Sequence, residues 1–232
     1  VNSLKTYYCK MCGIVAFKGN KEKTSEVIFE GLKLLEYRGY DSCGIGVIDN
    51  NEIKTFKWKG RVRKTEKRFN ESNIKSPIAI GHTRWATHGE PNDINSHPIM
   101  SYNKKFAIVH NGIIENYREL KKILIEKGYK FYTETDTEVL VNFIELCISN
   151  SKNVDKGLSY ALSKLEGAFG IVLIQRSNND IMYAARKGSP LAFGKKGDNF
   201  FIASDATPII KYTKKIIYLD NGQLLKINKS NF

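Results

Sequence analysis

The stretch Met11-Cys12-Gly13-Ile14-Val15 places a cysteine at the start of an apolar run that is expected to form a buried strand. If the mature chain begins at Cys12, this residue carries a thiol and a free α-amine together. The thiol is a nucleophile once deprotonated, and an α-amine with a pKa of about 7.7–8.0 suits a general base at neutral pH. One residue would then supply both nucleophile and base. Alternatively, Cys12 is a small buried residue of the first strand, as free cysteines commonly are.

Length and composition favour one large globular domain. The chain has 232 residues, of which 41% are hydrophobic and 26% charged, and a second domain is not required. The sequence contains no apolar run of about 18 residues, and its first ten residues lack the apolar core of a secretory signal. Four cysteines are too few for a disulfide framework. We therefore expect a cytoplasmic protein without a membrane association.

The net charge of +13 leaves two interpretations open. A basic nucleic-acid-binding or scaffolding module, in which Cys12 is only structural, would bind polyanions with a steep salt dependence. A solvated lysine-rich surface explains the same charge. The lysines are spread along the whole chain and form no long basic block. We therefore favour the second interpretation and expect no nucleic-acid partner.

The cysteine and histidine spacings do not favour a metal site. Cys9 and Cys12 form a CxxC pair, which is at most half of a zinc site. All four histidines fall in one stretch, and their spacings of six, nine and thirteen do not match a helical metal motif. We expect neither a metal nor a cofactor.

Hydrophobic periodicity predicts helices and short strands in an order that suits two packed sheets. Helices are expected over residues 21–37, 61–71, 115–127 and 155–165, and another opens at a capping box formed by Thr135 and Glu138. Strands are expected over residues 12–18, 44–48, 53–58, 78–83, 106–110, 168–175, 181–185, 191–194, 200–203, 215–219 and 223–227. The expected fold is α+β, with two mostly antiparallel sheets covered by helices on both outer faces.

Two charged residues could recognise the two ends of an amino acid. Arg84, at the end of an expected strand, can hold a carboxylate through two hydrogen bonds, and Trp85 beside it can wall a pocket. Asp136 can pair with a substrate ammonium group. The alternatives are a surface arginine, a core tryptophan and a carboxylate that stabilises a helix N-terminus.

His110-Asn111-Gly112 offers the parts of an oxyanion hole. Asn111 has an amide donor, and Gly112 lets the backbone N–H approach a reacting atom closely. The alternative is a tight turn, which Asn-Gly favours by itself. A nucleophile, a carboxylate clamp, an ammonium partner and an oxyanion hole together fit hydrolysis of the side-chain amide of glutamine, although none of these signals is decisive singly.

Five motifs, in this order, resemble the class II glutamine amidotransferases. They are Cys-Gly-Ile-Val at 12–15, Glu-Tyr-Arg-Gly-Tyr-Asp-Ser at 36–42, His-Thr-Arg-Trp-Ala-Thr-His-Gly at 82–89, His-Asn-Gly-Ile-Ile-Glu-Asn at 110–116 and Glu-Thr-Asp-Thr-Glu at 134–138. The resemblance runs from Met11 to about Ile227. It implies an N-terminal-nucleophile hydrolase fold, a four-layer αββα sandwich.

The resemblance also implies a role for each site residue. Cys12 would form a γ-glutamyl thioester that water then hydrolyses to glutamate. Arg84 would bind the glutamine α-carboxylate and Asp136 its α-amino group. Trp85, Thr87 and His88 would line the pocket. Asn111 and the Gly112 N–H would form the oxyanion hole, and Arg38 and Gly39 would support the cysteine.

The best-matching branch delivers ammonia to a sugar-phosphate isomerase half for amino-sugar synthesis. The branch of purine synthesis ranks second, because it typically has Gln-Asp-Ser where this chain has Tyr-Asp-Ser at 40–42, and Arg-Tyr-Ser-Thr where it has Arg-Trp-Ala-Thr at 84–87. A related amidotransferase with another acceptor stays open.

Two departures from the family pattern concern the ends of the chain. We expect residues 1–11 to be absent or removed in the active form, which leaves residues 12–232 as the glutaminase domain. The isomerase half would be a further domain or subunit, and without it the chain should make only glutamate and ammonia. The full-length enzyme is expected to be a homo-oligomer.

Overall fold

The computed structural model describes residues 12–85, 90, 92–229 and 231–232. Its larger sheet contains seven strands: β1 Gly13–Lys18, β2 Ser42–Asp49, β3 Glu52–Lys59, β4 Ile78–Arg84, β9 Ala192–Lys196, β10 Asn199–Ala203 and β11 Ile216–Tyr218. Their order across the sheet is β11-β9-β10-β1-β4-β2-β3. The first strand therefore lies in the middle of the sheet, where it pairs antiparallel with both β10 and β4.

The smaller sheet contains five strands: β5 Ile99–Met100, β6 Phe106–Ile114, β7 Gly167–Gln175, β8 Asn178–Lys187 and β12 Leu224–Asn228. Their order is β12-β8-β7-β6-β5, and each neighbouring pair is antiparallel. β6 pairs with β7 over its whole length, from Phe106 opposite Gln175 to Ile114 opposite Gly167.

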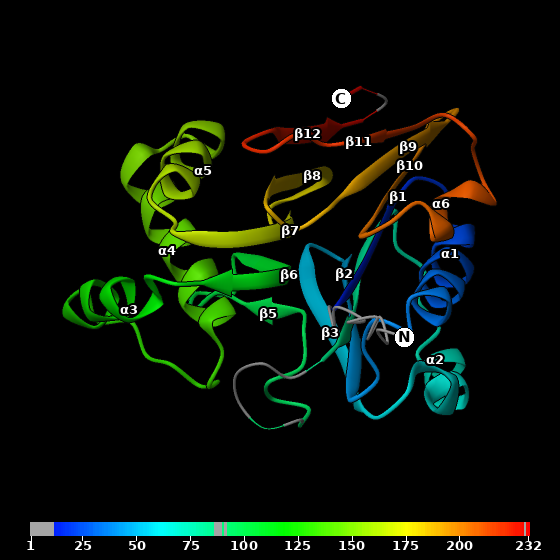
Figure 1. Cartoon of the computed structure of the whole chain (residues 1–232), viewed down its shortest axis with the longest axis horizontal. Helices are drawn as coiled ribbons and strands as arrows, with labels where there is room; N and C mark the ends of the chain where they lie inside the picture. The colour runs from blue at the N-terminus through cyan, green and yellow to red at the C-terminus, as the bar shows by residue number, and fades with distance from the viewer. Residues whose placement is uncertain (1–11, 86–89, 91, 230) are drawn as a thin grey trace, which may run out of the picture.

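Helices cover the outer face of each sheet, so that the molecule has four layers (Figure 1). On the side of the larger sheet lie α1 Lys21–Leu34, a 3₁₀ turn at Val62–Thr65, α2 Glu66–Glu71 and α6 Thr207–Ile210. On the side of the smaller sheet lie α3 Tyr117–Glu126, α4 Asp136–Ser151 and α5 Val154–Ser163. None of the helices within the described residues is both long and apolar enough to cross a bilayer.

Alternation along the central strands fills two of the three apolar layers. In β1, Ile14 and Ala16 belong to the cluster between the two sheets, whereas Val15 and Phe17 belong to the cluster beneath α1. Successive side chains of a strand point to opposite faces, so a central strand of a covered sheet must be apolar on both. All six residues of β1 are accordingly buried.

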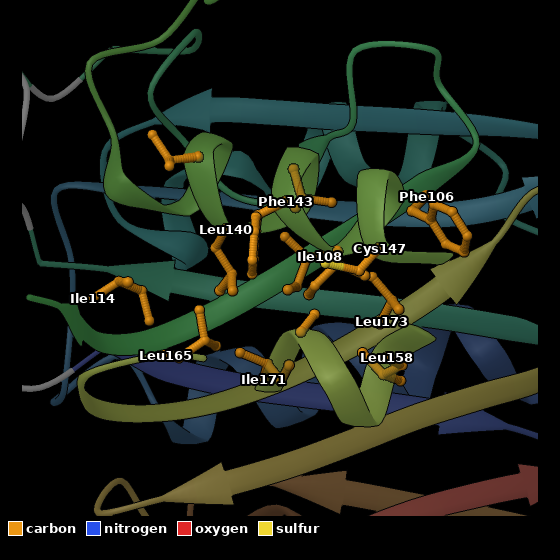
Figure 2. Packing of buried hydrophobic residues seen from close by; sticks show 14 of the residues in the cluster. Phe106, Ile108, Ile114, Leu140, Phe143, Cys147, Leu158, Leu165, Ile171 and Leu173 are labelled. Atoms are coloured by element: carbon orange, nitrogen blue, oxygen red, sulfur yellow. The ribbon is translucent and has the colours of Figure 1, made fainter. Parts of the chain in front are cut away.

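The third apolar layer joins α4 and α5 to the smaller sheet. Figure 2 shows Leu140, Phe143 and Cys147 of α4 directed toward Ile108 and Ile171 of the sheet. These side chains are buried, and Leu140 and Ile108 are fully so. Because α4 is fixed by this packing, its first residue, Asp136, is fixed relative to the end of β6.

The expected four-layer αββα fold is confirmed, and the differences are local. The first helix ends at Leu34, not Tyr37, because the chain turns there through the Arg38 N–H to Leu35 carbonyl bond. The segment 61–71 begins as a 3₁₀ turn and becomes α-helical only at Glu66. The two-residue strand β5 and the four-residue helix α6 were not expected, since elements so short leave no periodic pattern.

Two further differences concern the ends of elements near the pocket. The turn interpretation of Asn111-Gly112 is wrong, because β6 continues through both residues to Ile114. The capping box is only half formed. Thr135 accepts the Glu138 N–H, but the Glu138 carboxylate accepts the N–H groups of Tyr132 and Thr133 instead of that of Thr135.

We expect Leu140→Ala to lower the free energy of unfolding by about 2–5 kcal/mol, because it removes a fully buried side chain and leaves a cavity. The measurement is urea unfolding followed by circular dichroism. Ile123→Ala on α3 is the matched control: its side chain is 43% exposed, so the change should stay within about 0.5 kcal/mol. Equal losses in the two variants would contradict the packing described here.

Candidate active site

Cys12 lies one residue before β1, at the end of a central strand of the larger sheet. Its Sγ accepts the backbone N–H of Trp85 at 3.2 Å and donates to the Trp85 carbonyl at 3.5 Å. Burial raises the pKa of this thiol to about 11, and the Trp85 N–H and the positive charges of Arg84 and Arg38 oppose that rise. In this environment the thiol is protonated at neutral pH, and a nearby base is needed to activate it.

Two side chains hold the carbonyl oxygen of Cys12. Arg38 Nε donates to it at 3.1 Å and Asn111 Nδ2 at 2.8 Å. Arg38 also contacts Asp205 Oδ2 through Nη1 at 3.5 Å. The backbone of Cys12 is therefore fixed from two sides, by the turn after α1 and by β6 of the opposite sheet.

Gly39 allows the turn that carries Arg38 to pass directly against the end of β4. A Cβ at this position would lie 2.7–2.9 Å from backbone atoms of Thr83 and Arg84, which is closer than real Cβ atoms approach. Any other residue would push the Arg38 segment away from β4. Gly39 thus supports the site by its lack of a side chain.

Gly112 has a backbone conformation that L-residues rarely adopt, with φ of 118°. A Cβ here would overlap the carbonyl oxygen of Ala168 on the neighbouring strand β7. Its own backbone is exposed and lines the cavity beside Cys12. Glycine is therefore required both by the dihedral angle and by the close approach of β7.

Two buried residues of opposite charge, Arg84 and Asp136, line the same cavity as Cys12. Arg84 ends β4, and its Nη1 donates to the Glu90 carbonyl at 3.3 Å. Asp136 opens α4, where a carboxylate is favoured by the helix dipole, and its Oδ2 accepts the Ile114 N–H at 2.9 Å. A molecule with one anionic and one cationic group is complementary to this pair.

The cavity is small in this structure. It holds about 20 Å³ of open space, little more than one water molecule requires. It is lined by Cys12, Arg84, Trp85, His97, His110, Gly112, Thr135, Asp136 and Thr137. An amino acid can enter only if these walls move apart.

Hydrogen bonds between two loops hold Glu90, the partner of Arg84, against the approach to α4. Asn95 Nδ2 donates to the Glu90 carbonyl at 3.1 Å and to Glu134 Oε2 at 3.2 Å. In addition, the backbone N–H of Glu90 donates to Glu134 Oε2, and the backbone N–H of Glu134 donates to Asn95 Oδ1. This network keeps the Arg84 end of β4 close to the segment that leads into Asp136.

The structure brings together most residues that the sequence indicated. Cys12, Arg84, Trp85, Gly112 and Asp136 share one cavity. Arg38 and Asn111 reach the Cys12 carbonyl, and Gly39 packs on Arg84, as described above. Thr87 and His88 lie outside the described residues.

Sequence reasoning missed several neighbours of the site. Ser204 accepts hydrogen bonds from the Ile14 N–H at 2.6 Å and from Asn111 Nδ2 at 2.9 Å, and Asp205 holds Arg38. Ser204 lies 190 and 93 positions from its two partners, and Asp205 lies 167 positions from Arg38, so no local pattern could reveal them. By contrast, His110 and Thr137 lie within two of the five motifs, and His97 lies eight residues after the motif that ends at residue 89. Among the described residues, no group of three or more His, Cys, Asp or Glu is arranged to hold a metal ion.

Comparison with known proteins identifies the family. A family model described as a glutamine amidotransferase domain matches residues 82–211, which is more than half of the chain. The glutamine–fructose-6-phosphate aminotransferases (isomerizing) of Bacteroides thetaiotaomicron and Caldanaerobacter subterraneus are 46% and 45% identical to it over 221 residues. These alignments cover 94% and 95% of this chain but only 36% of each relative.

A solved structure supports the same assignment. The glutamine phosphoribosylpyrophosphate amidotransferase of Bacillus subtilis superposes with a TM-score of 0.80 at 28% identity. The match covers 95% of this chain and 48% of that one. The fold is therefore that of the N-terminal-nucleophile amidotransferase domains, and the chain belongs to the glutamine amidotransferase domain family.

Proposed function

We propose that this domain hydrolyses the side-chain amide of L-glutamine and supplies the ammonia for synthesis of glucosamine 6-phosphate from fructose 6-phosphate. The observation that carries the proposal is the cavity in which the Cys12 thiol faces a buried arginine and a buried aspartate. Arg84 would bind the α-carboxylate of glutamine, and Asp136 its α-ammonium group. The side-chain amide would then extend toward Cys12, with Trp85, Thr87 and His88 lining the pocket.

The reaction requires one nucleophile and one base. Cys12 Sγ attacks the amide carbon of glutamine, and the thiol proton passes to the α-amine of the same residue. Collapse of the tetrahedral intermediate breaks the C–N bond, and the amine returns the proton to the departing ammonia. Water then attacks the γ-glutamyl thioester, which releases glutamate and restores the thiol.

The oxyanion of each tetrahedral intermediate would be stabilised by Asn111 and the Gly112 N–H. In the present structure the two hydrogens of Asn111 Nδ2 face the Cys12 carbonyl and Ser204 Oγ. One of these contacts must open or be shared when the oxyanion forms. The small volume of the cavity likewise indicates that substrate binding rearranges the walls.

We propose that residues 1–11 are absent from the active form. While a peptide bond joins Met11 to Cys12, the nitrogen of Cys12 has no useful basicity, and a thiol with a pKa of about 11 has no activator. Arg38 and Gly39 would support the cysteine in either form. Residues 12–232 would then be the catalytic domain.

The proposed acceptor is a sugar-phosphate isomerase domain or subunit. The relatives that carry the isomerizing aminotransferase name are about 45% identical to this chain, against 28% for the phosphoribosylpyrophosphate enzyme. The chain spans only about 36% of those relatives, so the acceptor step is assigned to a part outside it. We also propose a cytoplasmic location. A homo-oligomeric full-length enzyme stays a prediction.

Glutamate release from glutamine should occur in protein whose intact mass shows that it begins at Cys12, and not in protein that keeps residues 1–11. Glutamate is measured with a coupled dehydrogenase. The control is Cys12→Ser in the trimmed form, which retains an N-terminal amine but loses the thiol. Equal turnover in the two wild-type forms would contradict the requirement for a free α-amine.

Arg84→Gln and Asp136→Asn should each lower kcat/KM for glutamine by about 30- to 4,000-fold, since each removes one partner of a buried charge pair worth about 2–5 kcal/mol. Steady-state kinetics on trimmed protein is the measurement. Arg176→Gln is the matched control, because this partly exposed arginine pairs with Glu52. If glutamine turnover survives both site substitutions unchanged, Arg84 and Asp136 do not bind the substrate.

Alkylation of Cys12 should distinguish the two forms of the chain by its pH dependence. With residues 1–11 present, the raised pKa of about 11 means that the rate should rise about tenfold per pH unit from pH 7 to 10. In the trimmed form the rate should level off above pH 8, near the pKa of the α-amine. Iodoacetamide labelling, followed by mass spectrometry of the Cys12 peptide, measures both. Identical profiles would show that the amine does not activate the thiol.

A further inference from the structure

We infer that His82 is a positioning residue for the amidotransferase reaction, because it fixes the side-chain amide of Asn111 in the orientation that presents Nδ2 to Cys12. His82 Nε2 lies 3.0 Å from Asn111 Oδ1, and Asn111 Nδ2 lies 2.8 Å from the Cys12 carbonyl. The histidine does not line the cavity, so its effect on the reaction is indirect, and its hydrogen bond to Asn111 supplies the route. The inference rests on the proposed function, since it concerns the same reaction.

The orientation of the Asn111 amide follows from its partners. The carbonyl oxygen of Cys12 can only accept a hydrogen bond, so the group that faces it must be the NH₂ end of the amide. Oδ1 therefore points to the opposite side, toward His82. If the amide were turned over, Oδ1 would face the Cys12 carbonyl, and two acceptors would meet without a proton between them.

The tautomer of His82 follows in the same way. Nε2 lies 3.0 Å from two oxygens, Asn111 Oδ1 and the His110 carbonyl, and both of these can only accept. Among the described residues, the other ring nitrogen, Nδ1, has no hydrogen-bond partner. A proton on Nδ1 would leave a buried donor unpaired and would place the Nε2 lone pair against two acceptors, which is costly. The proton therefore resides on Nε2, and His82 donates to Asn111.

The surroundings of His82 keep it neutral. The ring is fully buried, and its centroid lies 4.3 Å from that of His97, which is itself 6.4 Å from His110. Burial lowers the pKa of His82 to about 3, and it also lowers those of the other two rings. One donor at Nε2 thus persists across the working pH range. A charged ring would gain a second donor with no acceptor.

The hydrogen bond from His82 favours one of the two orientations of the Asn111 side-chain amide. Ser204 Oγ can accept or donate, so by itself it tolerates either orientation of the amide. The His82 N–H tolerates only one. Without this donor only the Cys12 carbonyl opposes the turned amide, so the correctly oriented fraction that can hold Cys12 and serve an oxyanion falls. This predicts a loss in kcat with little change in KM, because Arg84 and Asp136 would still bind glutamine.

The test compares His82→Gln and His82→Leu in protein that begins at Cys12. Glutamine can place an N–H where Nε2 lies, whereas leucine fills the space without a donor. His82→Leu should lose kcat, but by no more than the roughly 100- to 1,000-fold expected when one oxyanion donor is removed. His82→Gln should stay within about threefold of the wild type. Thermal unfolding of each variant accompanies the kinetics, so that a folding defect is recognised as such.

A double-mutant cycle with Asn111→Ala separates positioning from a general structural role. If His82 acts through Asn111, adding His82→Leu to Asn111→Ala should cause no further loss of kcat. The inference would be overturned if the double variant lost kcat by the product of the two single losses. It would also be overturned if kcat were unchanged in His82→Leu, or if His82→Gln were as impaired as His82→Leu.

¹⁵N NMR of the imidazole nitrogens tests the tautomer without reference to activity. We expect His82 to have a protonated Nε2 and an unprotonated Nδ1. The NMR resonances of the Asn111 side-chain amide should change their chemical shifts in His82→Leu. A protonated Nδ1 would overturn the inference even if glutamine is turned over. Conversely, an inactive wild-type protein with the expected tautomer and shift would refute the proposed function alone.

Discussion

Strand β1 is buried on both faces, and this constraint determines where Cys12 can lie. Ile14 and Ala16 pack between the sheets while Val15 and Phe17 pack beneath α1, so the strand cannot slide by one residue without exchanging its two sets of side chains. Cys12 directly precedes the strand and is therefore placed at the end of a central strand of the larger sheet. The site is assembled around this fixed point.

Each layer of the fold contributes something to Cys12. The turn after α1 brings Arg38 to its carbonyl, β6 brings Asn111, and the end of β4 brings the Trp85 N–H to its sulfur. The smaller sheet and α4 place Gly112 and Asp136 on the facing wall. Since these elements belong to both halves of the sandwich, the site depends on the packing between the sheets.

Burial shifts the pKa values of the ionisable groups around Cys12. The same loss of water raises the pKa of the thiol and lowers those of the neighbouring histidines. A thiol in this setting is poorly activated by its surroundings alone, which is why the proposed function relies on an α-amine. The neutral histidines, in turn, add hydrogen bonds beside the cavity without adding positive charge.

Local patterns were enough to predict the layers and most elements, and the motifs indicated Cys12, Arg84, Trp85, Gly112 and Asp136 of the residues that line the cavity. Alternation and helical periodicity reflect burial directly, and motifs such as His-Thr-Arg-Trp and Glu-Thr-Asp-Thr-Glu carry several site residues within a few positions. The short elements β5 and α6 were not predicted. The continuation of β6 through Asn111-Gly112 was not predicted either, because the pairing with β7 overrides the turn preference of that dipeptide. The positions of Ser204 and Asp205 could come only from the folded chain. The antiparallel pairing of β1 with β10 places Ser204 beside Ile14, 190 residues away, and no sequence pattern encodes a contact across that separation.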